Sequence, residues 1–506
     1  MKSASHKQIV VMAIWLCSAV SLLAKNTEPL VLFNPAPVAR TVNAARGPAD
    51  DSKAGVPVEI NAEALQPGAV KVGDVIVVEP ASGVVFTVRV SRVTTDINGT
   101  LSWIGEVAGH PNGYFLLSAS EGQALGSIEL PDEGMRYLLR YDMALRQHLA
   151  YSALPVDWTV LEDSPSPSPP PDTTNTYTAT PASDDVPAVN INLDVMVVYT
   201  PAARTNAGSV AAMNTIIAQA IARGQLAMDN TRIPITLRLV HASEISYVES
   251  GAALTDLYRL TGTSDGYMDN VHTLRDTYGA DLVSLFEKID DTGGIGWLLE
   301  ATNGQSTFAF SITRSQQASY TYTTVHEMGH NMGCHHRRDQ STQPGPGLYS
   351  YSAGWRWIGT NSGKYASIMS YEEDSYSRVA YWSSPTNYYM GVATGTTTDD
   401  NARTIRNVKT VVAGYRTAAA TNTFTFKAVA LTNNVVLRWP DPTGCGAATR
   451  MVHIRYRTDQ YPSATNDGTE VYTGTNLVFE HTGLTPNQPC YYTIWVSDDG
   501  ETFVDP

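Results

Sequence analysis

Cysteine is scarce in this chain, with four among 506 residues. Cys17, Cys334, Cys445 and Cys490 are too few for a small scaffold held together by disulfides. Residues 25–163 contain no cysteine, so no thiolate from that region can block a metal site elsewhere in the chain. Cys445 and Cys490 can pair in an oxidising compartment, although the sequence does not require that pairing.

Clustered positive charge is missing as well. The chain has 34 Lys and Arg against 49 Asp and Glu, which gives a formal net charge of −15. Nucleic-acid phosphates are bound by clustered Lys and Arg, so we expect no nucleic-acid partner. After residue 24 no stretch is long and apolar enough to cross a bilayer, and stable membrane insertion is not expected either.

The one long apolar run lies at the start of the chain. Residues 8–24, QIVVMAIWLCSAVSLLA, carry no charge and follow Lys2 and Lys7. The run is shorter than the roughly 20 residues that a membrane-spanning helix needs. This pattern predicts a secretory signal peptide over residues 1–24, cut after Ala24. We therefore expect a secreted, extracellular protein, with the periplasm as the alternative.

A proline- and serine-rich stretch divides the rest of the chain. Residues 164–171 read SPSPSPPP, and a Thr-, Ser- and Asp-rich stretch follows. This composition cannot bury a core, so we interpret residues 164–190 as an extended linker accessible to proteases. Before it, residues 25–163 form a β-rich unit with alternating strands, expected at 72–80, 84–93 and 113–119. We interpret this unit as a propeptide, with a permanent N-terminal β domain as the alternative.

Residues 191–418 alternate strands with helices. Strands are predicted at 193–200, 235–242, 280–286 and near 307–313, and helices at 209–229, around 268–278 and at 399–415. This alternation predicts an α/β domain with a mixed sheet. The last unit, residues 423–506, shows strands separated by turn signals, which is typical of a β-sandwich. The fold class is therefore multidomain.

The most specific motif is HEMGHNMGCHH at residues 326–336. On a helix, His326 and His330 project from one face, where two imidazoles can bind one Zn²⁺. Glu327, beside the first ligand, can act as general base on a water activated by the metal. The pattern predicts a helix that carries a zinc site.

The third zinc ligand must come from the turn that follows. Gly333 can adopt the left-handed conformation that ends a helix, so the chain can return to the metal. Chemistry alone allows His335 or His336, and the spacing favours His336. Cys334 is a further alternative, because a thiolate also binds zinc, but it follows the turning glycine immediately. Three protein ligands leave a fourth position open, which is typical of a catalytic site.

The motif H-E-x-x-H-x-x-G-x-x-H resembles the zinc-binding consensus of the metzincin metalloendopeptidases. That family has a methionine turn beneath the metal, and Ser367 to Tyr371 read SIMSY. The resemblance implies that Met369 forms an apolar floor under the imidazoles. Tyr371 resembles the tyrosine of astacin-like and serralysin-like members, which implies a role at the oxyanion. An ordinary core methionine and a packed tyrosine are the alternatives.

Other segments resemble bacterial reprolysin-like (M12-type) members. Residues 382–385 (WSSP) and 399–403 (DDNAR) resemble the end of their catalytic domain, whereas Arg337 stands where reprolysins usually have Asp. Peptidyl-Asp metalloendopeptidases are one candidate subfamily, and Asp184-Asp185 would suit self-processing by an enzyme that cuts before aspartate. Residues 293–299 (GGIGWLL) lie where the family binds substrate as an added strand, or form a glycine-rich loop without that role.

The resemblance also bears on the flanking units. Since residues 25–163 lack cysteine, the propeptide would need an Asp, Glu or His such as His110 to silence the zinc. Trp439 and residues 483–486 (GLTP) resemble a fibronectin type III module. Such modules act mainly as spacers or adhesion units, which implies contact with extracellular matrix or a surface.

We therefore predict a secreted zinc metalloendopeptidase made as a latent zymogen and acting on proteins or peptides. The predicted ligands of Zn²⁺ are His326, His330 and His336, and Glu327 and Tyr371 are the predicted catalytic residues. The alternative is a non-catalytic adhesion or matrix-binding protein on a metzincin scaffold. Such a protein would usually have lost the base or a ligand, and this chain retains all of them.

Overall fold

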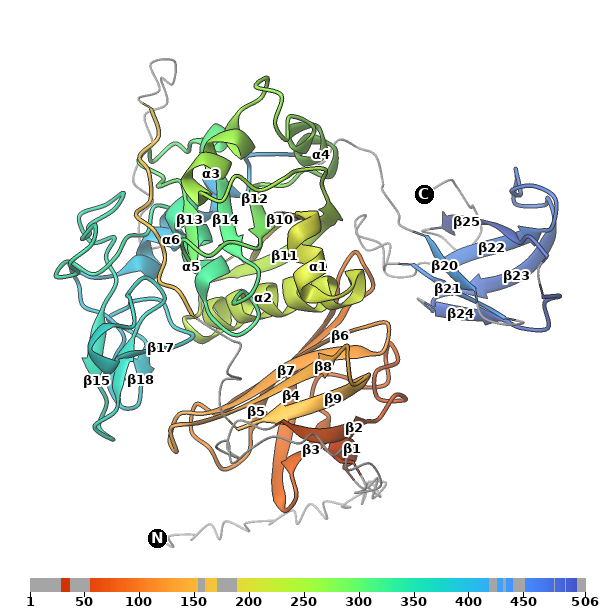
Figure 1. The fold of residues 1–506 in the computed structure, drawn as a ribbon, viewed down its shortest axis with the longest axis horizontal. Coiled ribbons are helices and arrows are strands. Elements are labelled where there is room, and N and C mark those ends of the chain that lie inside the picture. Colours follow the sequence, from red (N-terminus) through yellow and green to blue (C-terminus); the bar gives the residue numbers. More distant parts are fainter. Residues whose placement is uncertain are drawn as a thin grey trace, which may run out of the picture.

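Three bodies make up the fold in the computed structural model (Figure 1). The structure describes residues 29–36, 55–152, 160–170, 189–417, 426–430, 434–439, 451–476, 478–486 and 488–497. The expected signal peptide, Cys445 and Asp184-Asp185 lie outside these ranges. Among the described residues, no helix has the length and apolar character needed to span a membrane.

The N-terminal body is a closed β-barrel in the order β1-β2-β9-β8-β7-β6-β5-β4-β3. Neighbouring strands are antiparallel except β1 and β3, which are parallel and close the barrel. The strands are β1 (Leu30–Pro35), β2 (Val56–Ile60), β3 (Val75–Ala81), β4 (Val84–Thr95), β5 (Leu101–Val107), β6 (Tyr114–Ser120), β7 (Gln123–Leu130), β8 (Met135–Asp142) and β9 (Gln147–Tyr151). The strands predicted from alternation coincide with β3, β4 and β6.

Burial along the barrel strands shows where the barrel contacts its neighbour. β4 alternates buried and exposed side chains, as expected for a strand with one face in the core. β6 and β7 are buried on both faces, because their outer face packs against the long helix α2 (Val210–Asn230). Ile104 and Leu116 accordingly belong to the core of the second body.

The second body is an α/β domain around a five-stranded sheet in the order β11-β10-β12-β14-β13. The first four strands are parallel and the edge strand β13 is antiparallel, so the sheet is mixed. The strands are β10 (Ile191–Tyr199), β11 (Ile235–Glu244), β12 (Leu282–Glu287), β13 (Gly294–Gly296) and β14 (Phe310–Arg314).

Helices cover both faces of this sheet (Figure 1). Along β10, Val195 and Val197 face the core shared with α2, whereas Met196 and Val198 face the core on the other side. The helices are α1 (Pro201–Ala207), α2, α3 (Ala253–Thr261), α4 (Asn270–Tyr278), α5 (Thr323–Asn331) and α6 (Asn401–Val412). The helices predicted at 209–229, around 268–278 and at 399–415 correspond to α2, α4 and α6, while α1 and α3 were not predicted.

Between α5 and α6 the chain forms loops and two small sheets rather than long elements. Their strands are β15 (Arg356–Ile358), β16 (Lys364–Ala366), β17 (Ser377–Arg378), β18 (Tyr388–Tyr389) and β19 (Val392–Ala393). An aromatic cluster that includes Trp357, Tyr365 and Tyr389 holds them together. These loops carry the groups that face α5.

The third body consists of two three-stranded sheets, in the orders β20-β21-β24 and β23-β22-β25. A shared core that includes Leu437, Trp439 and Ile454 lies between their strands. The strands are β20 (Lys427–Ala430), β21 (Val435–Arg438), β22 (Met451–Arg457), β23 (Thr469–Gly474), β24 (Val478–His481) and β25 (Tyr491–Ser497).

A buried charge cluster joins the barrel to the α/β domain. The Glu129 carboxylate on β7 accepts from Arg223 of α2 at 3.0 Å and lies 3.1 Å from Arg136. Burial alone would raise the pKa of Glu129, but the two arginines outweigh burial and the pKa lies below its ordinary value. Nearby, the hydroxyls of Tyr114 and Tyr322 are 2.5 Å apart. The interface between the barrel and the α/β domain therefore combines apolar packing with buried ion pairs and a pair of tyrosine hydroxyls.

Replacing Glu129 tests this anchor. We expect Glu129→Ala to lower the free energy of unfolding of the full-length chain by about 3–5 kcal/mol, because Arg223 stays buried without its carboxylate. Denaturant titration measures the change. Arg92→Ala is the matched control, since Arg92 joins the same two bodies through Asp229 but in a solvent-exposed pair. Its effect should be below about 1 kcal/mol, and equal effects would show that the buried cluster is not the anchor.

Candidate metal centre

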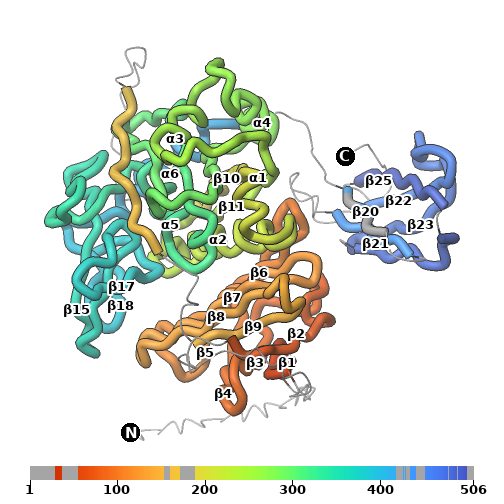
Figure 2. Tube along the Cα trace, in the orientation of Figure 1, coloured from red at the N-terminus to blue at the C-terminus, as the bar shows by residue number. Residues whose placement is uncertain are grey.

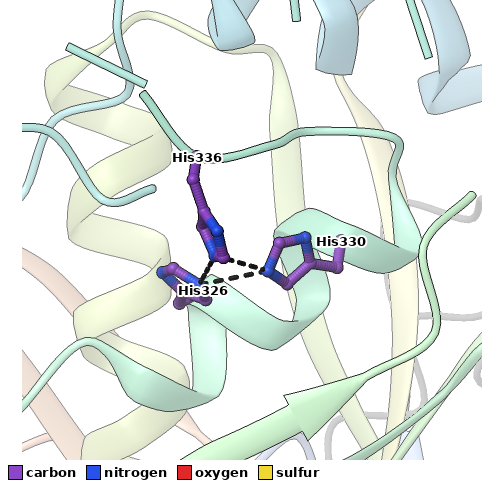
Figure 3. A group of neighbouring side chains, drawn as sticks. All are labelled: His326, His330 and His336. Atoms are coloured by element: carbon purple, nitrogen blue, oxygen red, sulfur yellow. Dashed lines mark hydrogen bonds between the residues drawn. The ribbon is translucent and has the colours of Figure 1, made fainter. Parts of the chain in front are cut away.

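Helix α5 and the turn after it bring three histidines to one point (Figure 3). The Nε2 atoms of His326, His330 and His336 lie 3.1–3.2 Å from one another. All three side chains are fully buried. Three nitrogens at this spacing can all reach one zinc ion at about 2.0–2.1 Å. The three residues predicted from the motif are thus brought together by the fold.

Hydrogen bonds of the Nδ1 atoms orient the three rings so that their Nε2 atoms face the centre. The Nδ1 atoms of the three histidines lie 2.9–3.1 Å from the backbone carbonyls of Ile368, Cys334 and Gln343. A carbonyl only accepts, so each Nδ1 carries the proton and each Nε2 keeps its lone pair for a metal. The donor set therefore fits a divalent ion such as zinc.

Burial keeps these rings neutral. It lowers the pKa of His326 and His330 well below the ordinary value, and neighbouring charges and rings add to the shift. The pKa of His336 falls to about 3, again mainly because of burial. Neutral imidazoles are the form that binds a metal, and no proton has to be displaced near neutral pH.

The turn after α5 explains why His336 is the third member. Gly333 has a φ of 80°, and its N–H donates to the carbonyl of His330 as the helix ends. His335 instead lies beside the centre, with its Nδ1 accepting from the backbone N–H of His336 at 2.7 Å. Cys334 is buried with Sγ 3.6 Å from the carbonyl of Asn401, outside the histidine group.

Glu327 lies on the same helix with both carboxylate oxygens buried and without a hydrogen-bond partner among the described residues. Burial and the nearby Asp163 charge raise its pKa well above the ordinary value. A Cβ on Gly294 would lie 2.8 Å from one of its oxygens, so the glycines of β13 make room for this carboxylate. A buried carboxyl that lacks a protein partner here suits a role in handling a metal-activated water.

The methionine turn lies next to α5. A Cβ on Gly329 would lie 2.7 Å from Met369 Sδ, so the helix and Met369 are in direct contact. Ile368 of the same turn accepts the Nδ1 proton of His326. The Tyr371 ring centroid is 4.7 Å from that of His336. Burial and nearby carboxylates raise the pKa of the Tyr371 phenol, so it is a proton donor at neutral pH.

Residues 160–170, the gold segment in Figure 2, run along the α/β domain beside β13 and α5. Gly293 donates its N–H to the carbonyl of Glu162 at 2.9 Å, and Ser164 donates to the carbonyl of Gly294 at 2.8 Å. Further along, Leu298 donates to the carbonyl of Pro167. The segment therefore extends the sheet past β13 and runs in the same direction as residues 293–298.

The other side of the segment is held by the loops after α5. The Gln343 side chain accepts from Ser166 N at 2.7 Å and donates to Ser166 O at 2.6 Å. The Tyr371 hydroxyl donates to the carbonyl of Asp163 at 2.7 Å. Composition predicted an accessible linker from residue 164 onwards. The first residues of that stretch, 164–170, instead lie between the edge of β13 and the loops after α5, and Ser166 is buried. We call this space between β13 and the loops the cleft.

Asp163 enters the centre itself. Its Oδ2 is 3.7 Å from His326 Nδ1 and 3.2 Å from a guanidinium nitrogen of Arg378. Burial raises the pKa of Asp163 to about 6, although Arg378 opposes that shift. His110, named above as a candidate blocking group, lies instead in a barrel turn and pairs with Asp132.

Sequence reasoning missed Asp163 and Arg378 because they are more than 200 residues apart and belong to no motif. The one available signal was the position of Asp163 directly before the Ser-Pro run. Arg337, the departure from the reprolysin pattern, is buried and pairs with Asp339 and Glu373.

The α/β domain that carries the three histidines matches a known protein family. The family model Reprolysin_5, described as Metallo-peptidase family M12, matches residues 190–383. Over these residues the chain is similar to the M12 metallopeptidases. The predicted resemblance to bacterial M12 metalloproteases is thereby confirmed, and we call residues 190–417 the peptidase domain.

Curated relatives are similar to somewhat less than half of this chain. A peptidyl-Asp metalloendopeptidase of Stenotrophomonas maltophilia (strain K279a) is 34% identical over 239 residues, covering 46% of this chain and 54% of its own length. One of Xanthomonas campestris is 33% identical over 240 residues, covering 47% and 54%. The chain thus spans about half the length of the curated relatives that it matches.

Among solved structures, metalloproteinase-II from Bacteroides fragilis aligns with 55% of this chain and 85% of its own, at 12% identity and a TM-score of 0.34. The family match covers residues 190–383, which lie within the peptidase domain. The fibronectin type III assignment and contact with a matrix or surface stay predictions.

Replacing His336 tests the centre as a metal site. We expect His336→Ala to lower the affinity for zinc by more than about 100-fold. Losing a group that only hydrogen-bonds to a ligand costs up to about 100-fold, and losing the ligand itself should cost more. Competition with a chelator and metal analysis after dialysis measure the change. Cys334→Ala and His335→Ala should each retain one equivalent of metal. Loss of the ion from Cys334→Ala would restore the thiolate alternative.

Proposed function

We propose that this protein is an exported, zinc-dependent metalloendopeptidase that is made in a latent form. The observation that carries the proposal is the convergence of three neutral imidazole Nε2 atoms beside the buried Glu327, within a domain that matches the M12 family. Aspartate-containing peptides are included among the substrates, because the similar relatives are named peptidyl-Asp metalloendopeptidases.

His326, His330 and His336 would hold the ion. When bound, zinc supplies the Lewis acidity that activates a water and polarises the peptide carbonyl. The Glu327 carboxylate accepts a proton from the attacking water and then delivers it to the leaving amine, so one water is added across the C–N bond.

Tyr371 would assist from the opposite side of the cleft. Its hydroxyl donates to a backbone carbonyl of the strand that lies in the cleft, here that of Asp163. A donor aimed at a peptide carbonyl can stabilise the negative charge that develops on that oxygen during attack. The same contact therefore supports a role for Tyr371 as an oxyanion donor when a substrate peptide takes the place of the segment.

Latency is supported by residues 160–168 in that cleft. The segment uses the edge of β13, the hydroxyl of Tyr371 and the amide of Gln343. A peptide substrate binding as an added strand would need the same groups. Substrate and segment would thus compete for one place, and the segment is linked covalently to the barrel. The non-catalytic alternative is not favoured, since the base and all three histidines are in position.

Replacing Glu327 tests the mechanism. We expect Glu327→Gln in the matured protein to lower kcat by about 10²–10⁴-fold, because the proton-transfer group is lost while the ligands stay. Hydrolysis of a quenched fluorescent peptide measures the rate, and metal analysis shows one equivalent retained. Glu244→Gln, a surface acid at the end of β11, is the control and should keep full activity. A Glu327→Gln variant as active as the parent would exclude this mechanism.

Latency makes a separate prediction. The folded full-length chain should cleave the same peptide at least about tenfold more slowly than the chain cut within residues 171–188 and separated from its N-terminal part, because residues 160–168 no longer compete with substrate. Mass spectrometry of the mature N-terminus identifies the cut. Equal rates for the intact chain and for the cut and separated chain would contradict latency without affecting the metal site.

A further inference from the structure

The guanidinium of Arg378 faces the bound segment but has no role in the proposed hydrolysis. Arg378 belongs to β17 and its side chain is 6% exposed. Its Nε donates to the carbonyl of Ser370, next to Tyr371 in sequence. Its two terminal nitrogens face the bound segment, at 3.2 Å from an oxygen of Asp163 and 3.2 Å from one of Glu162.

This side chain lies beside the reacting groups. The Asp163 oxygen that contacts Arg378 is also 3.7 Å from the ring of His326. The carbonyl of the same residue accepts from Tyr371. One residue of the bound strand therefore offers its backbone to the oxyanion donor and its side chain to Arg378.

Removal of the segment would leave the guanidinium short of partners. Among the described residues, both anions within 3.2 Å of its terminal nitrogens belong to residues 160–168. In the peptidase domain, Nε donates to the carbonyl of Ser370, and the Glu372 carboxylate accepts from the backbone N–H of Arg378 rather than from the terminal nitrogens. An arginine this deeply buried is stable only when an anion or several acceptors face it. A peptide that enters the cleft can supply that anion.

We propose that Arg378 is a specificity-determining residue that selects peptides with an acidic side chain at the position of Asp163. Asp163 is the occupant of that subsite in the uncut chain. The inference deepens the proposed function and rests on it, because it names the residue that recognises the substrate.

The chemistry of arginine favours a carboxylate over its neutral analogues. The guanidinium has five N–H donors, no acceptor and a permanent charge. An asparagine at the same place would offer one oxygen without charge and turn an N–H₂ towards other donors. A lysine would place two cations together in a buried site. The ranking expected for the side chain in this subsite is therefore Asp above Asn and Ala, with Lys excluded.

A series of peptides on the matured protein tests the proposal. The peptides share one sequence and differ in a single residue, which is Asp, Glu, Asn, Ala or Lys. We expect kcat/KM for the Asp peptide to exceed that for the Asn peptide by about 30-fold or more. If the protein cleaves all five at equal rates, the role of Arg378 is wrong while the peptidase function stands. If the protein cleaves neither these five peptides nor any other peptide, the proposed function itself fails.

Variants locate the preference on Arg378. Arg378→Met should remove most of the difference between the Asp and Asn peptides, and Arg378→Lys should restore part of it. Both should keep one equivalent of zinc and cleave the Ala peptide, which separates substrate selection from loss of the site. Arg356→Met is the matched control, because Arg356 lies on β15 of the same small sheet but pairs with Asp374 and Asp339, which are exposed. It should leave the preference unchanged.

A second measurement needs no variant of the peptidase domain. A synthetic peptide of residues 160–170 should inhibit the matured protein. The same peptide with Asp163→Asn should require an at least about tenfold higher concentration for equal inhibition. A third peptide with Glu162→Gln should differ less, because Glu162 is much more exposed than Asp163. Equal inhibition by all three peptides would overturn the proposal even if Arg378→Met failed to fold.

Discussion

Three hydrogen bonds from imidazole Nδ1 atoms to backbone carbonyls define the centre of this protein. The acceptors are Ile368, Cys334 and Gln343, which lie in the methionine turn, the end of α5 and the loop after it. Each bond decides both the tautomer and the direction of one ring. The loops between α5 and α6 contain little regular structure, but they are packed: one part forms its own aromatic core, and Ile368 and Cys334 belong to the main core together with Met328 of α5.

The edge of the sheet at β13 consists of glycines, and their lack of side chains shapes the cleft. Gly294 and Gly296 leave space for the Glu327 carboxylate, and a Cβ on Gly293 would lie 2.3 Å from the carbonyl of Leu161. The absence of side chains lets a second strand approach the sheet edge while the acid stays beneath it. Residues 293–296 thus leave room for the Glu327 carboxylate and for the bound segment at once. This is why their composition resembles a loop although β13 pairs as a strand.

The sequence predicted the histidine helix, its ligands, the mixed sheet and most long elements, because these depend on local spacing and periodicity. It missed α3, whose apolar residues Ala253, Leu257 and Leu260 form only a short stripe. It also left the blocking group open among Asp, Glu and His. Asp163 and Arg378 meet only because residues 160–168 fold back over the peptidase domain, and no local pattern encodes a contact between residues so far apart. The burial of β5 to β7 on both faces likewise reflects docking on α2 rather than the barrel strands themselves.

The barrel and residues 160–170 are one covalent piece, and residues 171–188 connect that piece to the peptidase domain. While the connection is intact, the segment is a tethered ligand, and tethering by a short linker corresponds to an effective concentration on the order of millimolar. A cut within 171–188 ends the tether but leaves the buried contact of Glu129 with Arg223 in place. Release then separates two molecules, and the fraction released at equilibrium depends on total protein concentration. Under the proposed latency, the cut molecule would stay occluded at high protein concentration and open on dilution, so that dilution itself would be the second step of activation.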